Sequence, residues 1–379
     1  MDLKNNIVIL GSTGVLGTKL VNFLHKNNLK INIITCFSNY KKLYRQKKKT
    51  NTKIALVLNP NIPIINNDLN YGDETLLNYI QKNPINIFYI LNTGFESLKY
   101  IESIIKFQKN CTVAIANKEI LVAGGKLLID RIISSKNKIL PLDSEHFSLI
   151  DLIPNRKNII EYISKIYLTA SGGPFYFDKK FNINNIILKD AIKHPIWKMG
   201  YKNSIDSSNL VNKILECFEL SSLYNIPLSN IDITISPKAF AHSIVFYTDH
   251  RISINCFKND MMIPLTSFFS NYTFYDKAKS NINSIKINDL SFNTFDNHKF
   301  QILKYKHRIF NFTHSQQINF MILNSEAISR FIATNIKYSE IIPFIFNNLD
   351  IFPKNKKFKS LYDIIKYTNI ISSSIKKIL

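Results

Sequence analysis

Short apolar runs alternate with helix-like stretches through the first 145 residues of the chain. The runs are NIVIL (6–10), INIIT (31–35), INIFYIL (85–91), TVAIA (112–116) and KILPL (138–142). Buried strands of a parallel sheet read as continuous apolar runs, and amphipathic helices separate them along the chain. The pattern therefore predicts an α/β fold whose N-terminal domain is built on a parallel sheet.

The pattern changes after residue 150, where strands and helices no longer alternate regularly. The sequence DSSNLVNKILECFELSSLY (206–224) predicts one amphipathic helix, with Asp206 and Ser207 available to cap its start. The other predicted elements are strands at 165–170 and 252–257, an Asn/Ser-rich connection at 271–300 and a helix at 318–336. We therefore expect an α+β region followed by a helical C-terminal region.

Length and composition narrow the classes of protein to consider. A chain of 379 residues with 45% hydrophobic composition is long enough for two or three domains. No apolar run reaches the length of about 18 residues that a membrane span needs, and the N-terminal run is too short for a signal peptide. The cysteines are scattered without a CxxC pair, which predicts a reducing compartment. They are Cys36, Cys111, Cys217 and Cys256. The absence of a targeting segment predicts the cytoplasm of a bacterium.

The formal net charge of +22 makes nucleic-acid binding an alternative, because lysines neutralise phosphates. The basic clusters at 41–49 and 354–358 lack aromatics at binding spacing, however, and are more typical of solvated helix faces or loops. A positive field also suits small phosphorylated anions. We therefore expect a small-molecule partner, without nucleic acid or membrane, and keep nucleic-acid binding as a weaker alternative.

A glycine loop, GSTGVLG (11–17), directly follows the first predicted strand and precedes a helix-like stretch. Glycines in this context let the backbone approach a diphosphate, which the helix N-terminus then binds with its amide groups. Binding sites for NAD place an acid at the end of the second strand, whereas this strand ends TCFSNYKK (35–42). The basic and polar residues there, including Ser38 and Asn39, predict NADP instead.

Two carboxylates stand close together after the fifth apolar run, in PLDSEHF (141–147). In an extended segment Asp143 and Glu145 would point to the same side, and Glu216 on the predicted helix could complete a cage of three carboxylates. Oxygen ligands suit Mg²⁺ or Mn²⁺. The alternative is a carboxylate pair neutralised by a lysine, with His146 in a supporting or structural role.

Several motifs occur in a fixed order across about two-thirds of the chain. They are GSTGVLG (11–17), ANKEILVAGG (116–125), PLDSEHFSL (141–149), LTASGGPF (168–175), HPIWKMGYK (194–202) and IDSSNLVNKILE (205–216). Together they resemble the 1-deoxy-D-xylulose 5-phosphate reductoisomerase family of the non-mevalonate isoprenoid pathway.

This resemblance implies a Rossmann-like NADPH-binding domain at 1–143 and a catalytic domain at 144–268 that includes a lid at about 171–201. It further implies a linker at 269–300 and a helical domain at 301–379, in a chain that forms a homodimer. The implied activity is the NADPH-dependent rearrangement and reduction of 1-deoxy-D-xylulose 5-phosphate to 2-C-methyl-D-erythritol 4-phosphate. The implied cofactors are NADPH and a divalent cation, Mg²⁺ or Mn²⁺, with Co²⁺ as a further candidate.

The resemblance also implies roles for individual residues. The metal ligands are Asp143, Glu145 and Glu216, which are catalytic together with Lys118, His194 and Trp197. Substrate contacts are implied for Lys118, Ser144, Glu145, Ser171, His194, Ser207, Asn212, Lys213 and Glu216, and the lid includes His194, Trp197 and Met199. Cofactor contacts are implied for Thr13, Gly14, Val15, Leu16, Ser38, Asn39, Asn117, Glu119 and Gly200.

The chain departs from the family pattern around an intact set of metal and phosphate positions. The departures are Val15, Leu16, Phe37, Ser38, Tyr201, Ile214 and Met262. They predict weaker binding of the 2′-phosphate and an enzyme that is active but either slower or less stable. Three of the residues also have purely structural alternatives. Trp197 could be part of the hydrophobic core, Ser207 a helix cap, and Lys118 an ion-pair partner of Glu119. A short-chain reductase with the pair Tyr162 and Lys165 is a further alternative.

Overall fold

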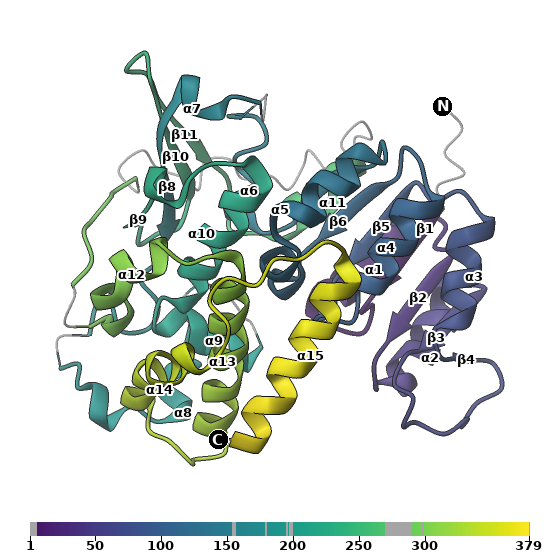
Figure 1. Ribbon diagram of the computed structural model, residues 1–379. Coiled ribbons are helices and arrows are strands. Elements are labelled where there is room, and N and C mark those ends of the chain that lie inside the picture. Colours follow the sequence, from purple (N-terminus) through teal and green to yellow (C-terminus); the bar gives the residue numbers. More distant parts are fainter. Residues whose placement is uncertain are drawn as a thin grey trace. The chain divides into compact units, whose positions relative to one another are not determined.

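The computed structural model describes residues 6–153, 157–178, 180–194, 196, 200–269, 290–296 and 299–378, which form two compact units (Figure 1). The first unit contains the described residues of 1–147 and 260–280, and the second contains those of 148–259 and 281–379. None of the helices in the described ranges combines enough length and hydrophobicity to cross a membrane.

A seven-stranded sheet forms the centre of the first unit, in the order β4-β3-β2-β1-β5-β6-β7. All neighbouring strands are parallel, as predicted. The strands are β1 (Ile7–Leu10), β2 (Ile33–Cys36), β3 (Ile54–Val57), β4 (Asn70–Tyr71), β5 (Ile87–Ile90), β6 (Thr112–Ile115) and β7 (Lys138–Pro141). The five predicted strands are confirmed, whereas β3 and β4 had no prediction. Strand order reverses at β1 and β5, which is where ligands bind in open sheets of this kind.

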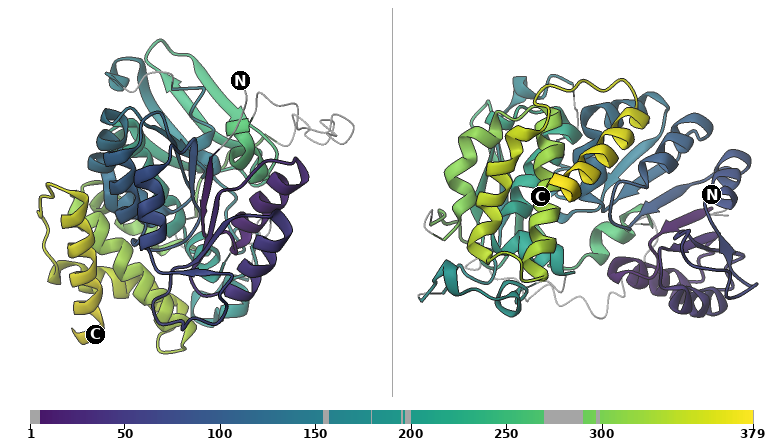
Figure 2. Two further views of the ribbon diagram at one scale, coloured as in Figure 1. Left: turned by 90° about the vertical axis from the view of Figure 1, so that its right-hand side faces the viewer. Right: turned by 60° about the horizontal axis from the view of Figure 1, so that its bottom comes forward.

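Two layers of helices cover this sheet (Figure 2). One layer contains α1 (Val15–Lys26), α2 (Tyr40–Thr50) and α11 (Met262–Thr266), and the other contains α3 (Glu74–Lys82), α4 (Leu98–Phe107) and α5 (Lys118–Ser134). Side chains from β1, α1 and α2, among them Ile9, Leu20 and Leu43, form a fully buried core under the first layer.

A segment distant in sequence completes that core. The described residues 260–269 return to the first unit, where Leu265 and Phe269 are buried. The Tyr89 hydroxyl on β5 donates a hydrogen bond to the Leu265 carbonyl over 2.8 Å, and the ring centroids of Phe23 and Phe269 are 6.3 Å apart. The first unit is therefore discontinuous along the chain.

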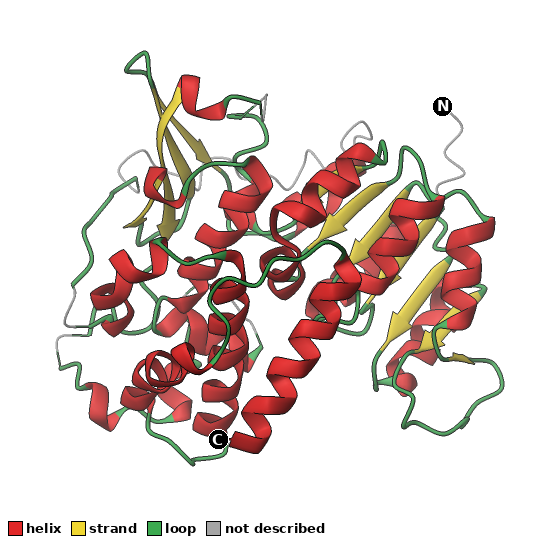
Figure 3. Cartoon of the chain, viewed as in Figure 1, coloured by secondary structure: helices red, strands yellow, loops and turns green. Residues whose placement is uncertain are grey.

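The second unit combines a four-stranded sheet, in the order β11-β10-β8-β9, with a set of helices (Figure 3). The strands are β8 (Ile163–Ala170), β9 (Ile231–Ile235), β10 (Ala241–Tyr247) and β11 (Ile252–Cys256), and only the β8/β9 pair is parallel. The α-helices are α7 (Ile159–Tyr162), α8 (Leu188–Ala191), α9 (Tyr201–Ser208), α10 (Val211–Tyr224), α12 (Lys306–Phe310), α13 (His314–Ile332), α14 (Ile341–Asn348) and α15 (Leu361–Ile378). The strand predictions at 165–170 and 252–257 and the helix prediction at 318–336 are confirmed within a few residues.

The prediction of one helix over 206–224 is wrong, because the chain breaks between α9 and α10. Leu210 adopts a left-handed conformation with φ of 67°, and the Asn209 side chain accepts a hydrogen bond from the Val211 amide over 3.0 Å. Such a local bond offers the backbone an alternative to the helical ladder. Asp206 and Ser207 consequently lie in the last turn of α9 and do not cap the start of a helix.

Candidate active site

The glycine loop between β1 and α1 is shaped by packing at two of its three glycines. Gly11 has φ of 79°, and a Cβ on Gly17 would lie 2.3 Å from the Gly11 carbonyl oxygen. At Gly14 a Cβ would meet only that oxygen, at 3.4 Å, which is an ordinary contact. Gly14 is the N-cap of α1 and makes no side-chain cap. The space at the helix N-terminus is therefore not needed for internal packing and suits an approaching phosphate.

The end of β2 has an exposed surface beside this loop. Phe37 is 61% exposed, and Ser38 and Asn39 are exposed as well. Asn39 has a structural function, because its side chain accepts the Lys42 amide at 3.2 Å and so caps α2. The Lys42 ammonium reaches back to the Thr13 carbonyl over 2.9 Å. Lys42 thus supports the glycine loop.

The other predicted cofactor residues of the first unit occupy α1 and the start of α5. Val15 is the first residue of α1 and is 58% exposed, whereas Leu16 packs against the core. Asn117 caps α5 by accepting the Ile120 amide, and its Nδ2 donates to two carbonyls, those of Asn92 and Gly94. Because these bonds use the amide group of Asn117, a cofactor contact there would go through the backbone. Glu119, in the first turn of α5, is 9% exposed.

Asp143 and Glu145 follow β7, but the segment is not extended as predicted. Residues Ser144–Phe147 form the short helix α6, and Asp143 Oδ1 accepts the Glu145 amide at 3.2 Å. An acid at a helix start is stabilised by such amides, which explains the turn. The two carboxylates nevertheless lie within 4.8 Å of each other.

Lys118 forms an ion pair with Asp143, and Ser144 Oγ donates to Glu145 Oε2 over 2.5 Å. The lysine pairing considered from the sequence is therefore present, with Asp143 as the observed partner. All four side chains lie at the carboxyl ends of β6 and β7, where ligands gather in such sheets. His146, next in the chain, is fully buried.

The first two turns of α10 carry a buried polar group of three residues. Lys213 and Glu216 form an ion pair with only 5% and 2% of their side chains exposed. Asn212 Nδ2 also donates to Glu216. The helical spacings of three and four residues place all three on one face, as predicted.

Ser171 and His194 contact each other beyond the end of β8. His194 Nε2 lies 3.3 Å from Ser171 Oγ, and its Nδ1 accepts the Ile196 amide at 3.2 Å. Since Nδ1 accepts, the neutral ring carries its proton on Nε2 and donates to Ser171. Burial, assisted by the charge of Lys213, lowers the pKa of His194 from its ordinary 6.5 to about 4. The ring is therefore neutral at physiological pH.

The remaining predicted residues of the second unit are only partly described. Ser207 is half-buried in α9, and Gly200 is the exposed N-cap of that helix. Trp197 and Met199 lie outside the described residues.

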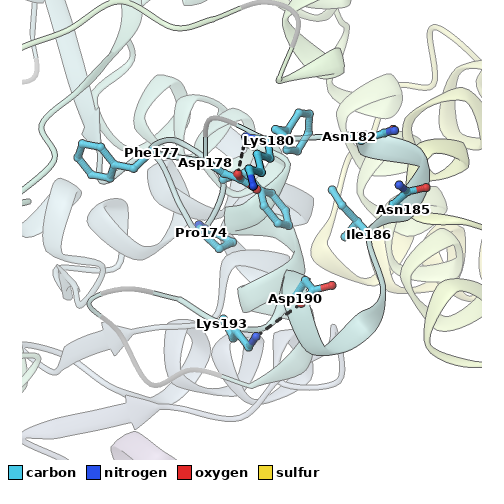
Figure 4. Close-up of a pocket in the computed structure, with 11 residues that line it drawn as sticks. Pro174, Phe177, Asp178, Lys180, Asn182, Asn185, Ile186, Asp190 and Lys193 are labelled. Atoms are coloured by element: carbon cyan, nitrogen blue, oxygen red, sulfur yellow. Dashed lines mark hydrogen bonds and ion pairs between the residues drawn. The ribbon is translucent and has the colours of Figure 1, made fainter.

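A cavity of about 430 Å³ opens in the segment 174–193, within the predicted lid (Figure 4). Asp178 accepts the Lys180 amide, and the charges of Asp190 and Lys193 pair at 3.6 Å. None of the predicted phosphate-binding residues lines this cavity. Two aspartates and two lysines line it, so it has no excess positive charge for a phosphate.

The predicted site residues thus form local groups within each unit. The first unit holds Thr13, Gly14, Val15, Leu16, Ser38, Asn39, Asn117, Lys118, Glu119, Asp143, Ser144 and Glu145, and the second holds Ser171, His194, Gly200, Ser207, Asn212, Lys213 and Glu216. Sequence reasoning gave no role to Gln46, which is buried and bonded to Ser12 in the glycine loop over 2.8 Å. It lies within a lysine-rich stretch that gave no sign of burial.

The short-chain reductase alternative is wrong. Tyr162 ends the four-residue helix α7, whereas Lys165 lies in strand β8 and pairs with Asp232 over 3.1 Å. The two side chains therefore do not share the helix that this chemistry would need.

A doubly wound sheet with a glycine loop after β1, joined to a second unit rich in acid, lysine and histidine groups, defines a dinucleotide-dependent oxidoreductase. The sequence matches the family model for 1-deoxy-D-xylulose 5-phosphate reductoisomerase at residues 7–125, and models for the C-terminal domains of these proteins at 139–224 and 258–372. A reductoisomerase of this name from Pelagibacter ubique is 33% identical over 94% of this chain and 93% of its own length. The chain therefore belongs to the 1-deoxy-D-xylulose 5-phosphate reductoisomerase family.

Other relatives and solved structures agree with this assignment. The reductoisomerase of Clostridium novyi is 31% identical and covers 98% of both chains. The Zymomonas mobilis reductoisomerase, solved in complex with NADPH, superposes with a TM-score of 0.80 at 26% identity over 97% of both chains. A reductoisomerase solved with NADPH, fosmidomycin and magnesium has a TM-score of 0.86 at 24% identity, over 99% of this chain and 97% of its own, which supports the fold. The resemblance and the fold class predicted from the sequence are confirmed.

Proposed function

We propose that this protein converts 1-deoxy-D-xylulose 5-phosphate to 2-C-methyl-D-erythritol 4-phosphate, using NADPH and a divalent cation. The carbon skeleton of the ketose phosphate rearranges to a branched aldehyde, which hydride from NADPH then reduces. The observation that carries the proposal is Glu216, a carboxylate buried to 1% exposure and contacted by Asn212 and Lys213. Burying an ion pair is energetically unfavourable unless its polar groups are well satisfied, so its presence favours a functional role.

NADPH would be held in the first unit. The open N-terminus of α1 at Gly14 suits the diphosphate. Ser38, which is exposed, stands where the family usually has an arginine or lysine for the 2′-phosphate. Thr13, Val15, Leu16, Asn39, Asn117 and Glu119 would complete the contacts, together with Gly200 from the second unit.

Asp143, Glu145 and Glu216 would together hold the divalent cation. An all-carboxylate set suits Mg²⁺ or Mn²⁺, and Asp143 and Glu145 already lie within 4.8 Å of each other. When bound, the cation polarises the oxygens of the substrate and stabilises charge that develops on them. Lys118 contacts Asp143 and Ser144 contacts Glu145, and these two residues would bind the oxygens on the reacting carbons of the substrate.

The substrate phosphate would be bound by Ser171, His194, Ser207, Asn212 and Lys213. His194 is neutral and donates from Nε2, so it contributes a hydrogen bond to this pocket, while Lys213 contributes the charge. The phosphate does not react, and its binding energy orients the ketose. Trp197 and Met199 would belong to the lid that excludes water.

We further propose a cytoplasmic homodimer. All four cysteines are without disulfides, which fits a reducing compartment. Strand β11 lies at the edge of its sheet and exposes Ile252 and Ile254 by 56% and 41%. An exposed apolar edge of this kind is suited to pairing with a second copy. Light scattering after size exclusion tests this, and a monomer at micromolar concentration would contradict it.

The decisive experiment follows NADPH oxidation at the nicotinamide absorbance, with deoxyxylulose phosphate and Mg²⁺ or Mn²⁺. We expect turnover that depends on both the ketose phosphate and the metal, with methylerythritol phosphate as the product. Absence of turnover with either metal, in a protein that binds NADPH, would contradict the proposal.

A further inference from the structure

The two chain segments proposed to bind the phosphate lie directly against each other in the second unit. Gly173 has φ of 66°, and a Cβ at this position would approach the Ser207 carbonyl oxygen to 3.0 Å. The turn after Ser171 is therefore packed on the last turn of α9, which carries Ser207. Any change in this packing alters the separation of the two serines.

Tyr338 contacts both segments. Its hydroxyl lies 2.9 Å from Ser208 Oγ, and its ring packs edge-on against Phe175 with centroids 5.7 Å apart. Ser208 donates its own proton to the Ile205 carbonyl over 2.7 Å, so Tyr338 is the donor to Ser208. Tyr338 is 4% exposed, and burial raises the pKa of its hydroxyl, which therefore keeps its proton.

A second bond holds the other side of Ser207. Asn324 on α13 donates to the buried carboxylate of Asp206 over 2.7 Å. Both neighbours of Ser207 are thus bonded to elements more than 100 positions further along the chain, while Ser207 itself stays half-buried. The structure fixes the backbone at Ser207 and leaves its side chain accessible.

We infer that Tyr338 is a positioning residue for the phosphate pocket: it fixes the distance between the segment that carries Ser207 and the segment that carries Ser171. The inference rests on the proposed function. Phenylalanine would fill the ring volume and keep the contact with Phe175, so the hydroxyl is the part that fixes α9. Losing it loosens the pocket for the phosphate and leaves the groups around the reacting carbons in place.

The test compares Tyr338→Phe with Tyr367→Phe. Tyr367 is a matched control in the same helical region, because it is 6% exposed and its hydroxyl donates to Asn319 over 2.8 Å. Both variants should lower the unfolding midpoint by similar amounts. For the phosphorylated ketose, Tyr338→Phe should lower kcat/KM about 5- to 20-fold, mostly through KM, and Tyr367→Phe should leave it unchanged. For dephosphorylated deoxyxylulose, both variants should equal the parent.

Equal losses on the two substrates in Tyr338→Phe, or a matching loss in Tyr367→Phe, would overturn the inference while the proposed function stands. If the parent does not turn over, the proposed function fails instead. In that case the positioning role is tested by measuring how far inorganic phosphate raises the midpoint of thermal unfolding. We then expect phosphate to raise the midpoint of the parent and of Tyr367→Phe more than that of Tyr338→Phe, and equal shifts would refute it.

Discussion

Lys213 and Glu216 form an ion pair one turn apart on α10, with almost no exposure to solvent. Removing only the ammonium takes the positive charge of Lys213 away from a buried carboxylate. We expect Lys213→Met to lower the free energy of unfolding by about 3–5 kcal/mol, measured by urea denaturation.

A second substitution and a surface pair serve as controls. Adding Glu216→Gln to Lys213→Met also removes the carboxylate charge and should restore most of the stability. Lys48→Met, which breaks an exposed pair with Asp68, should change the midpoint little. A double variant as unstable as Lys213→Met would show that packing, not charge, explains the effect.

The proposed metal set predicts how its members respond to substitution. Asp143→Asn removes a ligand charge and should reduce turnover by more than about 100-fold, beyond the 10- to 100-fold typical of outer-sphere partners. NADPH binding, followed by fluorescence, should stay near the parent value. Near-parent activity in this variant, or activity that EDTA does not diminish, would contradict the metal assignment.

The two glycines Gly14 and Gly17 should separate cofactor binding from folding. In Gly17→Ala the new Cβ meets backbone at 2.3 Å, so we expect a loss of about 1–3 kcal/mol in stability. In Gly14→Ala the nearest atom is at 3.4 Å, so stability should hold while the KM for NADPH rises. If Gly14→Ala binds NADPH as the parent does, the diphosphate lies elsewhere.

Ser38 is the place to strengthen selectivity for NADPH. A guanidinium there can bind the 2′-phosphate with a charge-assisted bond worth about 1.5–3 kcal/mol. Ser38→Arg should therefore lower the KM for NADPH by about 10- to 150-fold and leave the KM for NADH unchanged, with Ser38→Ala as the control. Asn39 is unsuitable, because it caps α2. A parent enzyme that prefers NADH would refute this assignment.

His194 predicts a pH dependence of stability. The pKa of His194 is about 4 in the folded protein and 6.5 in the unfolded chain. Between these pH values the unfolded chain therefore binds the proton and the folded chain does not. Its contribution to stability is therefore lost as the pH falls from about 6.5 to 4. His194→Gln should make the urea midpoint depend less on pH over that range, and substitution of exposed His250 should leave the pH dependence unchanged. Parallel curves for His194→Gln and the parent would refute the burial of a neutral ring.

The sequence was most informative where a residue's surroundings are set by its immediate neighbours. The runs that form β1 and β5 are buried on both faces, so they are apolar throughout and recognisable. The same holds for Asn212 and Glu216, because helical spacing alone brings them together.

It was least informative where a single side-chain hydrogen bond, local or distant, decides the structure. Leu210 is apolar and fits the helical pattern, and that pattern does not show whether the neighbouring Asn209 side chain will accept the Val211 amide and break the helix. Tyr338 follows Ser208 by 130 positions, and their bond follows from tertiary packing alone. The helical turn at Ser144 depends on the side chain of Asp143 accepting an amide, a choice that an alternating pattern does not show.

The return of residues 260–269 to the first unit has a consequence for biosynthesis. A ribosome delivers the chain from its N-terminus, and domains generally fold as they emerge. Here the core beneath α1 lacks Leu265 and Phe269 until residues 148–259 of the second unit have been translated. The apolar surface of the nascent sheet therefore stays exposed during this part of translation, and we expect chaperones to bind it during that time. A fragment ending near residue 150 should for the same reason aggregate, and adding residues 260–269 through a short linker should rescue its solubility.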